Sequence, residues 1–173
     1  MKPVTVCLLF LATLAFGKKV TVENSCPSGA VAELGPKPFR IYNDVFCFLF
    51  TTTSQAVYAD AEKACSAHNG TLAMPKTNAI NLFLEKSIDE LGIDEPLWVG
   101  IDDRKTEGQF VYADGTKVDW DNFNLFTNPA FQWFQDCVAI DNRYGLWNRY
   151  RCTNTLVTNA YRPFICQYEI EKK

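Results

Sequence analysis

The sequence predicts a single α+β domain, and three features of the chain support that fold class. Two helical patterns with apolar stripes come early, and several short apolar runs with strand character follow them. A length of 173 residues with 47% hydrophobic residues suits one domain with a substantial core. The stretch 120–136 is rich in aromatic residues but lacks helical or strand periodicity, which is typical of an ordered binding loop.

Residues 1–17 have the pattern of a secretory signal peptide. Lys2 supplies a basic start, residues 4–16 form an apolar run, and Ala15-Phe16-Gly17 is a small-x-small cleavage motif. The run is shorter than the roughly 20 residues that span a bilayer, so a membrane anchor is disfavoured. We expect cleavage after Gly17 and secretion of a mature chain without a membrane span.

Removal of the signal peptide would take Cys7 with it and leave six cysteines. An even number of cysteines in an oxidising compartment predicts three disulfides. Metal ligation is the alternative, but the chain has no C-x-x-C motif and a single histidine, His68. Disulfides are therefore favoured, and the residues alone leave all fifteen connectivities open.

The N-terminal half is predicted to hold an arm, a strand and two helices. Residues 18–44 are punctuated by glycine and proline and should form an irregular arm, followed by a buried strand over 45–50. Ser54 is suited to cap a first helix that runs to Asn69-Gly70. A second helix should start at residue 76 or 77 and end at Gly92. The apolar stripes of the two helices are Val57, Ala61, Ala64 and Cys65, and then Ile80, Phe83, Leu84, Ile88 and Leu91.

Short strands and turns fill the C-terminal half. Asp114-Gly115 marks a tight turn, and residues 102–108 form a charged turn. The expected strands are residues 97–101, 109–112, 137–140, 146–150 and 162–167.

Seven motifs in order resemble the C-type lectin-like domain, over roughly residues 26–168. They are Leu97–Ile101, Glu107–Phe110, Asp114-Gly115, Trp120, Asp136–Val138, Leu146–Asn148 and Phe164–Cys166. The resemblance implies two helices flanking short antiparallel sheets, with a long irregular ligand loop. It also implies that Trp98, Trp120 and Trp147 lie in the core. The disulfides that it implies are Cys65–Cys166, Cys137–Cys152 and the additional N-terminal bridge Cys26–Cys47.

In sugar-binding members of that family, a Ca²⁺ ion in the long loop ligates two sugar hydroxyls. The resemblance places Asn128-Pro129-Ala130, Gln135 and Asn148-Arg149 at the ligand positions. Asn128, Gln135 and Asn148 offer neutral oxygens, but no carboxylate remains, and Arg149 adds a positive charge. We therefore expect the sugar-ligating calcium to be absent, while Pro129 keeps the position where family members form a cis bond.

A second, structural calcium position of the family retains more of its acidic residues. Asp103, Glu107 and Asp136 match three of its ligands, and the fourth, near Phe131, has no counterpart. The alternative is that Asp103 and Glu107 are turn residues that accept hydrogen bonds from backbone N–H groups. The sequence leaves both interpretations open.

Other residues suggest ligand contacts or modification. Trp133 is the loop aromatic that we expect to be exposed, since aromatic side chains stack on sugars or anchor protein partners. Arg149 and Arg151 alternate on an expected strand and, with Arg143, would form a small basic patch for an anionic group. Asn69-Gly70-Thr71 is an N-glycosylation sequon on Asn69.

Three functional hypotheses follow, and none is enzymatic, because neither His68 nor the cysteines form a catalytic pattern. The first is a secreted lectin-like module that binds a glycan or microbial surface without a calcium bridge. The second is a calcium-dependent lectin with an altered site, and the third is a protein-binding module. A net charge of −3 gives no reason to expect nucleic acid as a partner.

Overall fold

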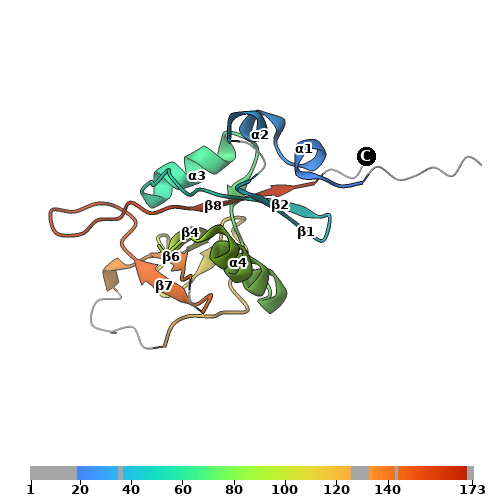
Figure 1. The fold of residues 1–173 in the computed structure, drawn as a ribbon. Helices are drawn as coiled ribbons and strands as arrows, with labels where there is room; N and C mark the ends of the chain where they lie inside the picture. Colours follow the sequence, from blue (N-terminus) through green and yellow to red (C-terminus); the bar gives the residue numbers. More distant parts are fainter. Residues whose placement is uncertain (1–18, 35–36, 126–132, 143, 171–173) are drawn as a thin grey trace, which may run out of the picture.

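Two four-stranded antiparallel sheets form the framework of the computed structural model, which describes residues 19–34, 37–125, 133–142 and 144–170 (Figure 1). The first sheet has the order β1-β2-β8-β3 and the second has the order β5-β4-β6-β7. A parallel bridge between Trp98 and Phe164 joins them. In chain order the strands are β1 (Phe39–Tyr42), β2 (Phe46–Phe50), β3 (Thr71–Leu72), β4 (Leu97–Asp102), β5 (Val111–Tyr112), β6 (Cys137–Ile140), β7 (Trp147–Tyr150) and β8 (Ile165–Glu169).

Helix α4 (Asn78–Leu91) confirms the second predicted helix, both in its position and in the residues that bound it. The Thr77 hydroxyl accepts a hydrogen bond from the Ile80 N–H at 3.2 Å, which caps the N-terminus. Gly92 ends the helix with a φ of 65°, a left-handed conformation that glycine adopts at little cost. Leu84 and Ile88 are fully buried, as the stripe predicts.

Helix α3 (Tyr58–Ser66) begins three residues later than predicted, because its N-cap is Val57 instead of Ser54. Ser54 does not cap it, because Ala56 pairs with Arg162 in an antiparallel bridge and holds this segment extended up to Val57. The buried face is Tyr58, Ala61 and Cys65, whereas Ala64 is exposed. The helix ends at Ser66, three residues before Asn69. Asn69 has a φ of 59°, so the predicted left-handed residue lies in the turn after the helix.

The N-terminal segment is more regular than its glycines and prolines predicted. It holds α1 (Val22–Ser25) and α2 (Ser28–Leu34), and then β1, which pairs with β2 at the edge of the first sheet. Ala30 is 2% exposed and belongs to the same buried cluster as the Cys26–Cys47 disulfide. Packing against the domain, rather than local propensity, therefore gives this segment its structure.

Two buried clusters make up the core, one on each side of the sheets. Trp98 lies at the centre of the first cluster and Trp147 at the centre of the second, and both are fully buried. Trp120 is partly buried and packs edge-on against Trp147 at 5.2 Å between ring centroids. The predicted core role is therefore confirmed for two tryptophans and is partial for the third.

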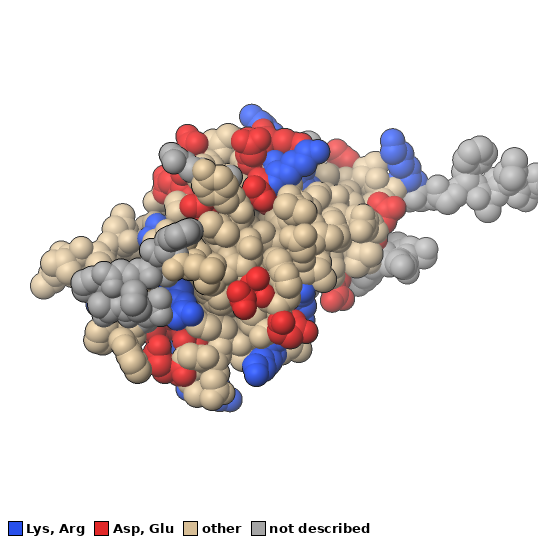
Figure 2. All heavy atoms as spheres, turned by 90° about the horizontal axis from the view of Figure 1, so that it is seen from below, with Lys and Arg blue, Asp and Glu red and all other residues tan. Residues whose placement is uncertain are grey.

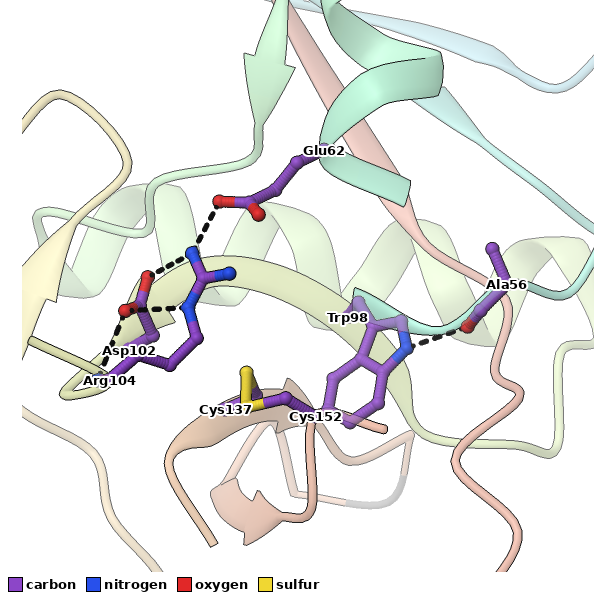
Figure 3. Close-up of a disulfide and its surroundings, with 7 residues drawn as sticks. All are labelled: Ala56, Glu62, Trp98, Asp102, Arg104, Cys137 and Cys152. Carbon is purple, nitrogen blue, oxygen red and sulfur yellow. Dashed lines mark hydrogen bonds and ion pairs between the residues drawn. A yellow bond between two sulfur atoms is a disulfide. The ribbon is translucent and has the colours of Figure 1, made fainter. Parts of the chain in front are cut away.

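All three predicted disulfides are present: Cys26–Cys47, Cys65–Cys166 and Cys137–Cys152. Cys65–Cys166 ties α3 to β8, and Cys137–Cys152 ties β6 to the segment after β7. Figure 3 shows Trp98 beside this last bridge, with its indole N–H donating to the Ala56 carbonyl at 2.9 Å. No helix within the described ranges is long and apolar enough to cross a membrane. Residues 1–17, the predicted signal peptide, lie outside those ranges.

Candidate functional site

The long loop connects β5 to β6, and the structure describes its two ends. Asn128, Pro129, Ala130 and Phe131 lie outside the described residues, so the predicted ligand triplet and cis bond are not placed. At the first end, Phe123 packs inward against Trp147, with 5.4 Å between ring centroids. At the second end, Trp133 is 70% exposed and Phe134 is 62% exposed. The expected exposure of Trp133 is thus observed.

Helix α4 anchors the strands beneath this loop through a buried asparagine that the sequence analysis did not single out. The Asn81 side chain is 1% exposed and accepts a hydrogen bond from the Trp147 indole N–H at 2.7 Å. Its amide also donates to the Gly145 carbonyl at 3.0 Å, which Asn122 contacts as well at 2.8 Å. A polar residue inside an apolar helical stripe is the signal that could have identified it.

Asn148 and Gln135 face different surroundings. Asn148 is 9% exposed, and its side-chain oxygen accepts a hydrogen bond from the Asn124 amide at 3.0 Å. Gln135 is half-buried and lines a small cleft with Tyr150 and Arg151. Neither residue supplies the carboxylate that Ca²⁺ prefers.

Arg149 lies on β7 and packs between two aromatic rings. Its guanidinium carbon is 4.6 Å from the centroid of the Phe110 ring and 4.9 Å from that of Phe123. Stacking of this kind favours a cation at a partly desolvated position. Burial raises the pKa of Asp103, and the charge of Arg149 opposes part of that rise, so Arg149 lies within electrostatic reach of the carboxylate.

Asp103 is the buried member of the predicted acidic set, at 3% exposure. One carboxylate oxygen accepts a hydrogen bond from the Gly108 N–H at 2.8 Å, as expected for a turn residue. Burial raises the pKa of Asp103, and the negative charges of Glu107 and Asp136 raise it further. The three carboxylates that the sequence singled out are therefore neighbours in space.

The fit of these groups to calcium differs between the two positions. At the sugar-ligating position the described residues do not fit, because the donors are neutral and Arg149 stands beside them. At the structural position, Asp103 Oδ1 and Asp136 Oδ1 are buried without a hydrogen-bond partner, which is an environment that suits a cation. Yet no three acidic, histidine or cysteine side chains in the described part of the chain converge to hold a metal. A structural calcium ion stays a prediction.

The profile of the Lectin C-type domain matches residues 54–168. The chain belongs to this family. The match starts just before α3 and ends on β8, and it includes every motif on which the resemblance rested. Membership confirms the predicted α+β fold, and it confirms that the domain is not an enzyme.

Among curated relatives of this C-type lectin domain, Collectin-11 from Bos taurus is 34% identical over 118 residues. That alignment covers 66% of this chain and 40% of the relative. Tetranectin from Homo sapiens is 27% identical over 128 residues, covering 72% of this chain and 60% of the relative. The chain therefore spans less than two thirds of either protein.

Solved structures agree with this C-type lectin fold. The mouse scavenger receptor C-type lectin carbohydrate-recognition domain aligns with a TM-score of 0.66 at 22% identity, over 80% of this chain and 98% of that domain. Human lithostathine aligns with the same TM-score and identity, over 78% of this chain and 90% of that structure.

A protruding hairpin beside the long loop was also missed by the sequence analysis. A strand was expected over residues 162–167, but β8 begins at Ile165, so the hairpin comprises residues 151–164. The hairpin extends at the left of Figure 1, and its tip carries Leu156 and Val157, which are 105% and 90% exposed. Arg162 at its base faces the same cleft as Arg151. The sequence feature that could have indicated this hairpin is the uncharged stretch 153–161, which lies between Arg151 and Arg162.

The basic patch that the sequence predicted stays a prediction, and the structure shows which rings two of its arginines contact. Arg149 packs on Phe110 and Phe123, whereas the Arg151 guanidinium lies 5.0 Å from the centroid of the Phe134 ring. Arg143 lies outside the described residues. On the face seen in Figure 2, acidic and basic side chains are interspersed, so neither sign dominates that surface.

Proposed function

We propose that this C-type lectin domain is a secreted recognition module that binds glycans of a microbial or other cell surface through the C-terminal end of its long loop. The observation that carries the proposal is the exposure of Trp133 and Phe134, at 70% and 62%, next to Arg151. Exposed neighbouring aromatic rings are costly in water unless a partner covers them. Flat aromatic faces suit the apolar faces of sugar rings, and an adjacent guanidinium supplies hydrogen-bond donors.

Recognition by this loop end would not depend on a calcium bridge. Arg149 brings positive charge to the region where sugar-binding relatives hold the ion, and the stacking on Phe110 and Phe123 keeps it there. Asn148 already satisfies its oxygen with Asn124. A calcium-dependent lectin with an altered site is the alternative that the same experiment tests.

Secretion is part of the proposal and rests on two features of the chain. Three disulfides are stable in an oxidising compartment, and residues 1–17 have a signal-peptide pattern. Asn69 is exposed at the end of the turn after α3, where an N-linked glycan could be attached without disturbing the core.

A glycan array probed with calcium and again with EDTA tests this function. We expect glycan binding in both buffers, and we expect Trp133→Ala to reduce it by about tenfold, the effect of losing a buried aromatic contact. Leu82→Ala is the matched control, since Leu82 is 53% exposed on α4, away from the loop. Binding that disappears in EDTA supports the calcium-dependent alternative instead.

Protein recognition is the second candidate, and the hairpin tip favours it. Leu156 and Val157 form an exposed apolar tip, which would suit a hydrophobic hot spot. If no glycan binds above background in either buffer, both lectin proposals are contradicted and this candidate leads.

A further inference from the structure

A small cleft with two positive side chains separates the end of the long loop from the protruding hairpin. Its volume is about 200 Å³, and it is lined by Gln135, Tyr150, Arg151, Thr158, Asn159 and Arg162. The long loop contributes the first of these residues, the end of β7 contributes the next two, and the hairpin contributes the remaining three. All of them lie in the described part of the chain.

Backbone hydrogen bonds and a disulfide hold the hairpin wall of the cleft. The base of the hairpin is fixed because Ala56 and Arg162 exchange backbone hydrogen bonds of 2.9 and 3.1 Å. Its tip is closed by Thr155, whose hydroxyl accepts from the Thr158 N–H at 3.1 Å. The Cys137–Cys152 disulfide ties the start of the hairpin to β6. The hairpin side of the cleft is therefore held in place by the chain itself.

The two arginines of the cleft pack against aromatic rings. The Arg162 guanidinium stacks 3.7 Å from the centroid of the Tyr150 ring and 5.3 Å from that of Trp98. Its Nε is buried and has no hydrogen-bond partner. Within the described residues, neither Arg162 nor Arg151 has a carboxylate at ion-pair distance. A partly buried cation without a counter-ion is costly, and an incoming anion removes that cost.

Two opposing effects act on the Arg162 guanidinium. Burial lowers the pKa of Arg162, and the opposing contributions come from Tyr150 and Glu95. Glu95 is itself hydrogen-bonded by Gln55 at 2.7 Å. The hairpin stretch 153–161 contains no acidic residue that could fill the cleft from its own wall. Arg151 and Arg162 are therefore the charged side chains that line the cleft, and both are basic.

We propose that this cleft is a subsite for an acidic group on a sugar, a sulfate ester or a carboxylate, held between Arg151 and Arg162. The proposal rests on the glycan-binding function above and names its ligand class. Guanidinium groups bind planar carboxylates and sulfated oxygens through paired hydrogen bonds. Asn159 Oδ1 accepts a hydrogen bond from the Tyr161 N–H at 2.9 Å. The N–H₂ of the same side chain can then donate to an anion, in addition to the two guanidinium groups. A sugar ring extending from the cleft would reach toward Phe134, which Arg151 contacts.

Nuclear magnetic resonance titration of the ¹⁵N-labelled full chain tests the subsite with small probes. The probes are N-acetylglucosamine 6-sulfate and glucuronic acid, each paired with its neutral parent sugar. We expect the acidic probes to bind about tenfold more tightly, as a charge-assisted contact predicts. Their largest shifts should fall on the amides of Gln135, Thr158 and Asn159. The two acidic probes distinguish a preference for sulfate from a preference for carboxylate.

Arg151→Gln should abolish the preference for acidic probes while the fold is retained. Arg40→Gln is the matched control, since Arg40 lies on β1 in the other sheet. Arg162→Gln is a second variant, although its stacking on Tyr150 and Trp98 makes it a risk to folding. Equal affinity for acidic and neutral probes, or an unchanged preference in Arg151→Gln, would overturn the subsite.

The two proposals fail in different ways. Loss of neutral-glycan binding in Trp133→Ala, with no acidic preference in the wild type, upholds the loop site and removes the anion subsite. If acidic probes shift the amide resonances of the cleft residues and Trp133→Ala leaves glycan binding unaffected, the subsite is upheld and the loop site is contradicted.

Discussion

Arg149 shows how a single residue changes the chemistry expected of this family. The charge is visible in the sequence, but its placement between the rings of Phe110 and Phe123 depends on three separate segments. The same side chain lowers the pKa of Asp103, against the effect of burial and of the acidic neighbours. Positive charge from the chain itself thus lies within electrostatic reach of Asp103.

The buried Asp103 carboxyl should make the stability of the domain depend on pH, because burial raises its pKa in the folded chain. A raised carboxyl pKa means that the folded state loses stability as the pH rises through that pKa. Asp103→Asn retains an oxygen to accept from Gly108 and removes the buried charge. In EDTA at pH 7 we expect a higher melting temperature than wild type, with the difference shrinking toward pH 4. Circular dichroism melting measures this.

Calcium added to the same samples tests the structural ion at Asp103. A bound ion would raise the melting temperature of the wild type and leave that of Asp103→Asn unchanged. Glu23→Gln, which removes a carboxylate from α1 far from this acidic set, is the charge control. If Asp103→Asn melts at a lower temperature than wild type at pH 7 in EDTA, the buried Asp103 carboxylate does not destabilise the fold, and the prediction is contradicted.

At the scale of elements, α4 both fills the core and holds the strands that carry the loop. Asn81 joins the helix to β7 through the Trp147 indole and to the preceding turn through Gly145. Both partners are buried, so removal of the amide leaves the Trp147 indole N–H without this hydrogen bond, while the Gly145 carbonyl keeps its bond from Asn122. The sequence shows that Asn81 is a polar residue on a predicted helix, but it does not show which groups Asn81 contacts.

Asn81→Ala should therefore destabilise the domain by about 1–3 kcal/mol, the cost of unsatisfied buried polar groups. Urea denaturation followed by tryptophan fluorescence measures the change. Lys86→Ala on the same helix is the control, because the Lys86 side chain is 77% exposed. A change below about 0.5 kcal/mol for Asn81→Ala, the range of ordinary surface substitutions, would mean that water replaces the amide.

The two main helices illustrate which element boundaries can be predicted. α4 is bounded by Thr77 and Gly92, whose side-chain and backbone chemistry act within one turn. The start of α3 depends on Ala56 pairing with Arg162, a partner more than one hundred residues away. Local capping rules could not have indicated that pairing, so they favoured Ser54.

For the whole molecule, the Cys65–Cys166 disulfide joins the first helix of the matched domain to its last strand, over a separation of 101 residues. In the chain-entropy model a loop of about 100 residues contributes about 4.7 kcal/mol, and one of about 15 residues contributes about 3 kcal/mol. The long bridge is thus expected to contribute more stability than either short one.

The double variant Cys65→Ala, Cys166→Ala should unfold near body temperature, as measured by thermal melting. The control is Cys26→Ala, Cys47→Ala, which opens a bridge with a separation of 21 residues and should retain a folded domain. Equal melting temperatures for the two double variants would contradict the entropic argument.

The sequence by itself determined the fold class, the second helix, the position of β6 and the identity of the long loop. Those features depend on local periodicity, capping residues and ordered motifs, which the chain carries without reference to distant partners. The tertiary structure decided where the arginines act. Arg151 and Arg162 are separated by a hairpin that only folding brings back onto β7, and the rings that hold them come from the loop and the core. Charge is a property of a residue, whereas an anion subsite is a property of the distances between residues.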